Sequence, residues 1–325
     1  MATKRRKKKK KAGGASAFLK GIVNIFLIVC IVVAASFILW KIKPVINTGE
    51  EKPKESTDRA DDDTSSKQIT SGIRFDFIDA DQSDCTLITT PNGKRILVDT
   101  GMIDRASDIL GFLEESKVKS IDYLILTHPH SDHIGGAPEI MTVYDVGCII
   151  MPNAAETGSS FDKLLAAIEN ERKGGCSVYE ARVNDVYMVD GCKLKIHGPV
   201  STDDEELNNS SVIMTLKYND FTALFSGDAE AVAEEAVLKN GANIDCDLMK
   251  IGHHGSSTSS TAEFLDAATP KVGIISCGRD NAYGHPHSEV IESLESRGIR
   301  YYVTADSGDI SVISDGKDYS VYTER

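Results

Sequence analysis

Short apolar runs alternate with amphipathic segments from residue 73 onward, which is the pattern of an α/β domain. The predicted strands cover residues 73–79, 85–90, 95–99, 121–126, 211–217, 221–225, 247–251, 271–276 and 300–304. The predicted helices cover residues 107–118, 160–173, 229–239 and 288–297, and a further one lies near Thr261. In the second of these, Phe161, Leu164 and Ile168 recur at helical spacing, and a Gly-Gly pair ends the helix. We therefore predict one layered domain over 71–325, with helices outside paired sheets.

The first seventy residues show a different pattern, which is typical of a membrane anchor. An unbroken basic run from Lys4 to Lys11 is followed, at 21–40, by a segment without charged residues. A helix of that length spans about 30 Å, the thickness of the hydrocarbon core of a bilayer. We predict three segments here: a basic cytoplasmic segment at 1–17, a transmembrane helix at 18–42 and a disordered acidic linker at 43–70.

This topology would make the protein a single-pass component of the cell membrane, with a cytoplasmic N-terminus and an extracytoplasmic domain. Cleavage by signal peptidase after the small residues at 33–35 is one alternative, and a lipoprotein-type site at Cys30 is another. The apolar run continues to Trp40, beyond both positions, which favours a retained anchor.

Charge also divides the chain. Residues 1–43 hold eleven of the 36 Lys and Arg and none of the 49 Asp and Glu, so the rest carries 25 basic and 49 acidic groups, a net −24. Tight non-specific binding of nucleic acid usually needs clustered positive charge, so the domain is a poor generic binder of polyanions. The basic run suits nucleic acid or anionic lipid as well, but its place beside an apolar helix makes membrane topology the simpler interpretation.

Six cysteines follow residue 70, on the side of the membrane where disulfides form. None has the CxxC spacing of a zinc ribbon. Four of them lie in apolar runs and are predicted to be buried thiols: Cys85, Cys148, Cys246 and Cys277. Cys176 and Cys192 remain as a candidate disulfide pair.

Candidate metal-binding residues are concentrated directly after the predicted strand over 121–126. From His128 to His133 the chain reads HPHSDH, three imidazoles and a carboxylate within six residues. Such groups would be left unsatisfied in a core, whereas a divalent cation binds them all. His128 and His130 can reach one ion, and Asp132 and His133 can reach a second position close by. The cluster therefore predicts a metal site.

The stretch from His128 to Gly136 fits HxHxDHxGG and resembles the signature of the metallo-β-lactamase superfamily. The resemblance extends over about 73–314 and includes LVDTG at 97–101, FSGD at 225–228 and KIGHHGS at 250–256. The most similar subgroup is the soluble domain of ComEC-type DNA-uptake proteins. The shared patterns are NNxS at 208–211, HHGS at 253–256 and NxYGHP at 281–286.

This resemblance implies a four-layer αββα sandwich and one or two divalent ions, zinc or alternatively manganese. The implied metal ligands are His128, His130, Asp132, His133, Asp228 and His253. In that assignment the first two hold one ion, Asp228 bridges, and the others hold the second ion. The implied catalytic residues are Asp132, His254 and His285. The last two would protonate the leaving group or contact the substrate, and the alternative role of His254 is to orient His253. Asp99 is expected to support the ligands.

Three features depart from the family pattern. The strand end at 79–85 reads DADQSDC where the DNA-uptake proteins have DVGQGDA. The position that best matches the usual third histidine of the first ion is Asn209, a neutral and weaker ligand. The sequence contains no counterpart of the membrane pore of the DNA-uptake proteins, so the resemblance does not imply DNA transport.

Two metal ions about 3.5–4 Å apart would lower the pKa of a bridging water and make hydroxide available. The first functional hypothesis is a membrane-anchored extracytoplasmic phosphodiesterase that acts on nucleic acid, nucleotides or a wall phosphodiester. The second is a hydrolase of esters, lactones or thioesters that uses the same metals. The third is a binding domain that kept the fold without catalysis, which Asn209 favours and the retained ligand residues oppose.

Overall fold

The computed structural model describes residues 70–201 and 206–325. The predicted transmembrane helix at 18–42, the basic segment at 1–17 and nearly all of the acidic linker at 43–70 lie outside these residues. Within the described part of the chain, no helix is both long and apolar enough to cross a bilayer.

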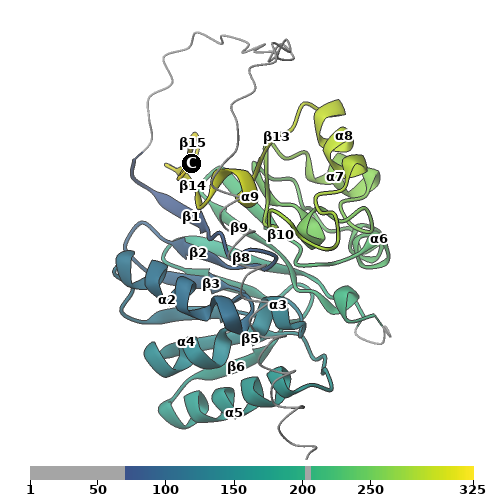
Figure 1. Ribbon diagram of the computed structural model, residues 1–325. Coiled ribbons are helices and arrows are strands. Elements are labelled where there is room, and N and C mark those ends of the chain that lie inside the picture. The colour runs from purple at the N-terminus through teal and green to yellow at the C-terminus, as the bar shows by residue number, and fades with distance from the viewer. Residues whose placement is uncertain (1–69, 202–205) are drawn as a thin grey trace, which may run out of the picture. The chain divides into compact units, whose positions relative to one another are not determined.

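The first sheet has eight strands in the order β15-β14-β1-β2-β3-β4-β5-β6. Their bounds are β1 Ile73–Phe77, β2 Thr86–Thr89, β3 Arg95–Val98, β4 Ile121–Ile125, β5 Val146–Met151, β6 Ser177–Glu180, β14 Ile310–Ser314 and β15 Tyr319–Thr323. Strands β3 to β6 run parallel, and the others pair antiparallel. Strand β14 therefore lies beside β1, and β15 pairs with the other edge of β14 (Figure 1).

The second sheet has seven strands in the order β13-β12-β11-β10-β9-β8-β7. Their bounds are β7 Val186–Val189, β8 Cys192–Gly198, β9 Ile213–Tyr218, β10 Phe221–Phe225, β11 Leu248–Lys250, β12 Val272–Ile275 and β13 Arg300–Val303. Strands β10 to β13 are parallel, as β3 to β6 are in the first sheet. Each sheet therefore has a set of parallel strands whose carboxyl ends are free to carry functional loops.

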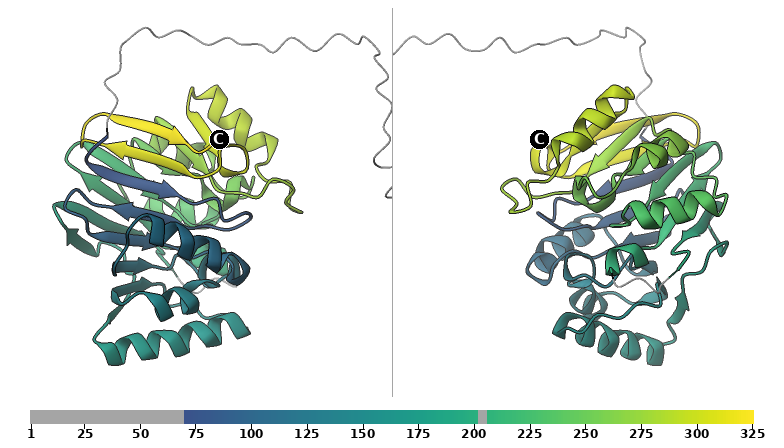
Figure 2. Two further views of the ribbon diagram at one scale, coloured as in Figure 1. Left: turned by 60° about the vertical axis from the view of Figure 1, so that its left-hand side comes forward. Right: turned by 90° about the vertical axis from the view of Figure 1, so that its right-hand side faces the viewer.

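Helices cover the outer face of each sheet, and Figures 1 and 2 show the two groups on opposite sides. The bounds of the helices are α2 Ala106–Glu115, α3 Ser131–Ile134, α4 Ala137–Val143, α5 Ser159–Gly174, α6 Ala231–Lys239, α7 Ala262–Ala268, α8 Ser288–Ser296 and α9 Thr304–Ser307. Apolar residues of α2, α4 and α5 pack on the first sheet, and those of α6, α7 and α8 pack on the second. The predicted α/β sandwich with helices outside two sheets is confirmed.

A third apolar cluster fills the space between the sheets. Phe75 and Phe77 of β1 meet Phe221 and Phe225 of β10, with ring centroids 5.9 Å apart for Phe75–Phe221 and 6.2 Å apart for Phe77–Phe225. All four side chains are buried. Burial of each ring contributes about 1.5–3 kcal/mol, so this cluster fixes how the two sheets, and hence their loops, face each other.

Most predicted elements occur within a few residues of the expected bounds, but several strands were not predicted. Strand β5 is an apolar run without regular alternation, exposed only at Gly147, and β6 and β7 are short, exposed edge strands. Neither kind has the two-residue period that identifies a half-buried strand. The candidate pairing of Cys176 with Cys192 is wrong, because all six cysteines in the described residues are free thiols.

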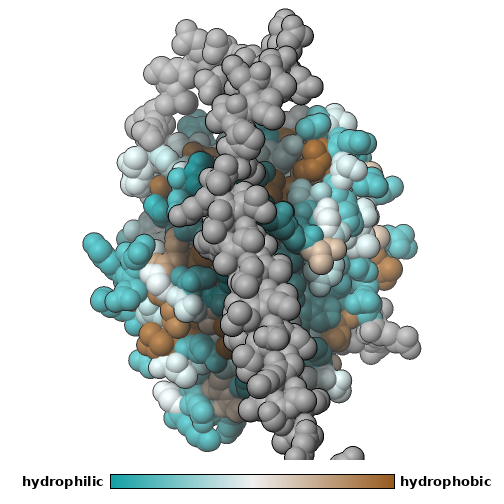
Figure 3. Space-filling model, viewed as in Figure 1, coloured by the Kyte–Doolittle hydropathy of each residue, from teal (hydrophilic) through white to brown (hydrophobic). Residues whose placement is uncertain are grey.

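The outer surface is mixed in polarity. Outside the grey atoms, the face in Figure 3 shows apolar residues scattered among polar ones. Single exposed apolar residues of this kind are normal on a folded domain.

Candidate metal centre

The motif residues converge because each follows the carboxyl end of a strand. Asp99 follows β3, and the HPHSDH segment follows β4 in the first sheet. Asp228 follows β10, and His253 and His254 follow β11 in the second sheet. Since these strands are packed face to face, their carboxyl ends bring side chains more than 100 residues apart into one cluster.

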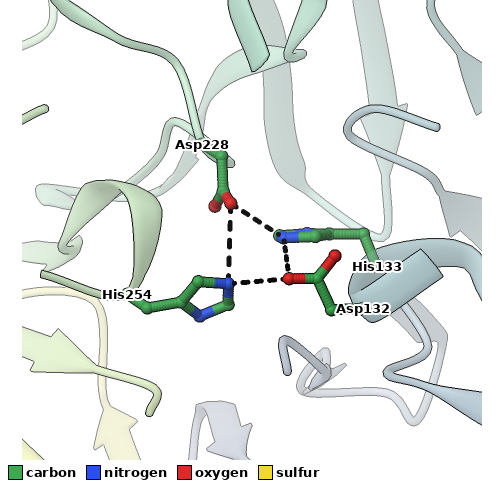
Figure 4. A group of neighbouring side chains, drawn as sticks. All are labelled: Asp132, His133, Asp228 and His254. Atoms are coloured by element: carbon green, nitrogen blue, oxygen red, sulfur yellow. Dashed lines mark hydrogen bonds and ion pairs between the residues drawn. The ribbon is translucent and has the colours of Figure 1, made fainter. Parts of the chain in front are cut away.

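Four side chains form the centre of this cluster, as Figure 4 shows: Asp132, His133, Asp228 and His254. Oδ2 of Asp228 lies 3.2 Å from Nε2 of His133 and 3.5 Å from Nε2 of His254. Oδ2 of Asp132 lies 3.3 Å from Nε2 of His254 and 4.0 Å from Nε2 of His133. One ligand atom from each residue falls within 4.8 Å of the others, a spacing that suits a single cation at the centre.

The polar atoms of this cluster fit a metal ion. Oδ1 of Asp228 is buried and makes no hydrogen bond. Nε2 of His133 is also buried without a hydrogen bond, and its contact there is the 3.2 Å ion pair with Oδ2 of Asp228. Buried polar atoms normally have partners, and imidazole nitrogen with carboxylate oxygen is a donor set that zinc and other first-row divalent ions accept. The cluster therefore has both the chemistry and the unpaired atoms that a divalent cation requires.

Burial and mutual attraction set the charges here. Burial alone raises the pKa of Asp228, but His133 and His254 lower it, and the net pKa is well below its ordinary value. Burial alone lowers the pKa of His133, but Asp228, Asp99 and Asp132 raise it well above the ordinary value. Without a metal the cluster is thus an imidazolium–carboxylate network, and a cation would replace the protons as the positive partner.

A second group of donors lies beside the first. Nε2 of His128 is 3.9 Å from Oδ2 of Asp228 and 3.1 Å from Nδ1 of His130. Burial, together with the nearby His133, lowers the pKa of His128 well below its ordinary value, so its imidazole is neutral and suited to bind a metal. Asp228 therefore lies within reach of both groups.

The two neighbouring asparagines have different environments. Oδ1 of Asn209, the residue predicted to replace a third histidine, accepts a hydrogen bond from the backbone N–H of Glu230 at 3.2 Å. Asn208 instead lines the pocket with His130 and Asp228, and its Oδ1 is buried without a hydrogen-bond partner. The geometry thus favours Asn208 over Asn209 as the neutral oxygen ligand. Both lie in a 3-10 turn, whose tight backbone decides which of two adjacent side chains faces the pocket.

The geometry also favours His254 over His253 as the ligand beside Asp132. Nε2 of His253 is 3.7 Å from Oδ2 of Asp228, but its Nδ1 faces Glu230 at 3.6 Å, and its side chain is 21% exposed. His254 is only 2% exposed, and its Nδ1 lies 2.9 Å from the backbone oxygen of Ser276, which leaves Nε2 to face the cluster. Both histidines have left-handed φ angles, 50° and 53°, so a tight reversal after β11 aims His254 inward.

Surrounding residues hold the ligands in place. Asp99 accepts hydrogen bonds from the Thr127 N–H and hydroxyl, each at 2.8 Å, and its Oδ2 lies 2.8 Å from Nδ1 of His133. The expected supporting role of Asp99 agrees with these contacts. Gly227 has φ of 53°, and a Cβ atom there would lie 2.8 Å from Cβ of Thr127. Only glycine therefore allows the turn that presents Asp228.

A buried ion pair beneath the cluster was not predicted. Nζ of Lys250 lies 2.6 Å from Oδ2 of Asp84, and the two side chains are only 4% and 7% exposed. Oδ1 of Asp84 in turn lies 3.6 Å from Nδ1 of His254. The one available signal was a lysine inside the apolar strand β11, since lysine is almost never fully buried unless it is paired.

A pocket of about 310 Å³ opens onto these residues. Asp132, Asp228 and His254 form its polar floor, and His285 and Tyr283 line it as well. Burial lowers the pKa of His285 to about 4, and the nearby His254 contributes to this shift. The imidazole of His285 is therefore neutral at pH 7. The sequence-predicted residues His130, His253 and His285 thus all border one pocket with the metal-binding candidates.

The comparison with family models decides the classification. The family model described as the metallo-beta-lactamase superfamily matches residues 78–279. This chain belongs to the metallo-beta-lactamase superfamily. Membership places it in the class of metal-dependent hydrolases, and the predicted resemblance to that superfamily is confirmed.

Curated relatives agree with the predicted subgroup. ComE operon protein 3 of Bacillus subtilis is 31% identical over 259 residues, which are 74% of this chain and 33% of that protein. Recombination protein 2 of Haemophilus influenzae is 30% identical over 244 residues, 74% of this chain and 28% of that protein. The chain thus spans about a third of the length of these relatives.

Among solved structures, the metallo-beta-lactamase fold protein YhfI of Bacillus subtilis aligns with a TM-score of 0.50 at 11% identity. The alignment covers 78% of this chain and 100% of that one. At this identity the likeness shows the shared fold.

Proposed function

We propose that this protein is a metal-dependent phosphodiesterase, anchored in the membrane by residues 18–42, whose domain acts outside the cytoplasm on short nucleic acid or nucleotide phosphodiesters. The observation that carries the proposal is the convergence of Asp132, Asp228 and His254 at the floor of an open 310 Å³ pocket. The similarity to a ComE operon protein and to a recombination protein supports nucleic acid as the source of the phosphodiester.

The donor groups suggest how this chain would hold its metal. His128, His130 and Asn208 would supply one position, and the second would be held by Asp132, His133 and His254. Asp228 is common to both. When bound, the metal supplies a Lewis acid and lowers the pKa of water toward neutrality. Zinc or manganese suits these nitrogen and oxygen donors.

His285 would contact the substrate through a hydrogen bond. The backbone N–H of Gly278 donates to Oε1 of Gln82, so the amide group of Gln82 points its Nε2 toward Nδ1 of His285, at 3.2 Å. Because an amide nitrogen only donates, Nδ1 accepts and the ring proton of His285 resides on Nε2. That N–H can donate a hydrogen bond to an oxygen of the phosphodiester, which supports the leaving group as charge develops on it.

Pocket size and charge favour a short substrate. A volume of about 310 Å³ is at the lower end for ligand pockets and suits about one nucleotide unit. The net charge of −24 on residues 44–325, 25 basic against 49 acidic groups, opposes the approach of a long polyanion, so we expect chain ends or short oligonucleotides to be cleaved in preference to long duplexes.

The test is hydrolysis of a chromogenic phosphodiester and of a chromogenic lactone by the full chain with added Zn²⁺ or Mn²⁺. We expect phosphodiester turnover that Asp228→Asn lowers more than about a hundredfold, since even residues behind metal ligands are worth 10–100-fold. Asp108→Asn, on the exposed side of α2, is the matched control and should retain activity. Turnover of the lactone alone would replace the phosphodiesterase proposal, and absence of both activities with metal bound would favour a binding domain.

The membrane anchor is tested separately. We expect the full chain to remain with membranes after alkaline carbonate extraction, and added protease to remove the domain from the outer face of intact cells. Release of the chain by carbonate, or a domain that protease reaches only after lysis, would contradict the proposed topology.

A further inference from the structure

Tyr283 combines high exposure with a position at the candidate active site. It is 66% exposed, and it lines the same pocket as Asp132 and His254. Its ring stacks on that of His285 with a centroid distance of 5.5 Å and an interplanar angle of 22°. A flat aromatic surface therefore stands at the rim of the pocket, partly open to any ligand that enters.

The loop that carries Tyr283 is held by one side chain. Nδ2 of Asn281 donates to the backbone oxygens of Gly278 at 2.8 Å and His285 at 2.6 Å. Oδ1 of Asn281 accepts from the backbone N–H groups of Tyr283 at 3.2 Å and His285 at 2.9 Å. These four hydrogen bonds pre-organise the backbone around the exposed tyrosine, so a ligand would meet a surface already in place.

The rings continue toward the metal centre. The ring of His285 is nearly parallel to that of His254, with a centroid distance of 6.2 Å and an angle of 21°. The order Tyr283, His285, His254 thus leads from solvent to the side chains around Asp228. A substrate with a flat ring close to its phosphate would match this order, with the ring at Tyr283 and the phosphate at the floor.

We propose that Tyr283, stacked on His285, is a subsite for the nucleobase next to the reacting phosphate. The subsite rests on the proposed function for the position of the phosphate. Stacking uses the face that every base has, so the subsite would bind all four bases with similar strength and would reject a sugar phosphate that lacks a base. Tyr283 then determines specificity and takes no part in the metal chemistry.

The experiment compares two probes, AMP and ribose 5-phosphate, by equilibrium dialysis against the full chain with Zn²⁺. We expect AMP to bind about tenfold more tightly than ribose 5-phosphate, a typical factor for one base on one aromatic side chain. Tyr283→Ala should remove that factor and leave ribose 5-phosphate binding unchanged, whereas Tyr283→Phe should keep it. Tyr179→Ala is the matched control, because Tyr179 is a 49% exposed tyrosine of β6 outside this pocket.

Equal binding of the two probes to the unmodified chain, or AMP binding that Tyr283→Ala leaves intact, would overturn the subsite. The outcome is separate from that of the proposed function. If AMP binding depends on Tyr283 but no phosphodiester is turned over, only the proposed phosphodiesterase function is refuted. If phosphodiesters are turned over but AMP binding does not change in Tyr283→Ala, only the proposed nucleobase subsite is refuted.

Discussion

The buried ion pair between Lys250 and Asp84 allows a quantitative prediction. Burial by itself lowers the pKa of Lys250, but Asp84 and Asp228 raise it, and the net shift is upward, so the ammonium group stays charged. Lys250→Met keeps an unbranched apolar stem, one heavy atom shorter than lysine, and removes this charge. It leaves the carboxylate of Asp84, 7% exposed, without its 2.6 Å partner. Loss of one member of a buried pair costs about 3–5 kcal/mol, because the other charge remains desolvated.

The assay is urea denaturation of the full chain in the presence of a chelator, so that metal binding does not contribute to the free energy of unfolding. Lys250→Met should lower that free energy by about 3–5 kcal/mol, and the double variant Lys250→Met/Asp84→Asn should cost much less than the sum of the two single variants. The matched control is Lys239→Met, which removes an ion pair of similar length, 2.7 Å to Glu235, on the exposed face of α6. That change should cost less than about 0.5 kcal/mol.

Similar losses for Lys250→Met and Lys239→Met would refute the reasoning, because burial is the only large difference between the two pairs. A double variant as unstable as the sum of the single variants would refute it as well. In that case the two side chains would contribute through separate packing, and their 2.6 Å contact would carry no coupling energy.

Three further predictions concern acid stability and metal binding. Burial holds the pKa of His197 at about 4, below an unfolded value of about 6.5, so the free energy of unfolding should fall by at most about 3 kcal/mol as the pH drops from 6.5 to 4. The measurement is the urea midpoint as a function of pH, and the same pH dependence in His197→Gln as in the unmodified chain would refute this. Zinc at a hundred times its Kd should raise the free energy of unfolding by about 2.7 kcal/mol, measured by thermal shift, and Asp228→Asn should abolish most of the gain; an equal gain in the variant would remove Asp228 from the ligands. Asn208→Ala should lower the bound metal measured by elemental analysis, and Asn209→Ala should leave it near normal; the reverse order would restore Asn209 as the ligand.

The core of the candidate metal centre could be predicted from the sequence because its signal is local. HPHSDH concentrates ligand-type residues within six positions directly after a buried strand, and no core of apolar side chains explains such a cluster. Asp228 was identifiable only through the resemblance of FSGD at 225–228 to the family pattern, because a single aspartate after an apolar strand does not by itself indicate a metal ligand. The alternation of strands and helices likewise predicts the layers, because each element must bury one face.

The distinction between adjacent residues depends on the tertiary structure. His253 and His254 have the same chemistry and both reach Asp228, but the left-handed backbone after β11 buries His254 against Asp132 and leaves His253 21% exposed, with its Nδ1 facing Glu230. Asn208 and Asn209 differ for the same reason, because a tight turn gives neighbouring side chains different directions.

The pairing of Lys250 with Asp84 depends on long-range packing in the same way. Lys250 ends β11 of the second sheet, and Asp84, 166 positions earlier, lies in the loop before β2 of the first sheet, so no local pattern predicts their 2.6 Å contact. The sequence by itself therefore determined which residue types could bind a metal and which strands carry them. The three-dimensional packing decided which member of each adjacent pair faces the centre and which charge compensates it, because side-chain direction and desolvation depend on backbone turns and neighbours that lie far away along the chain.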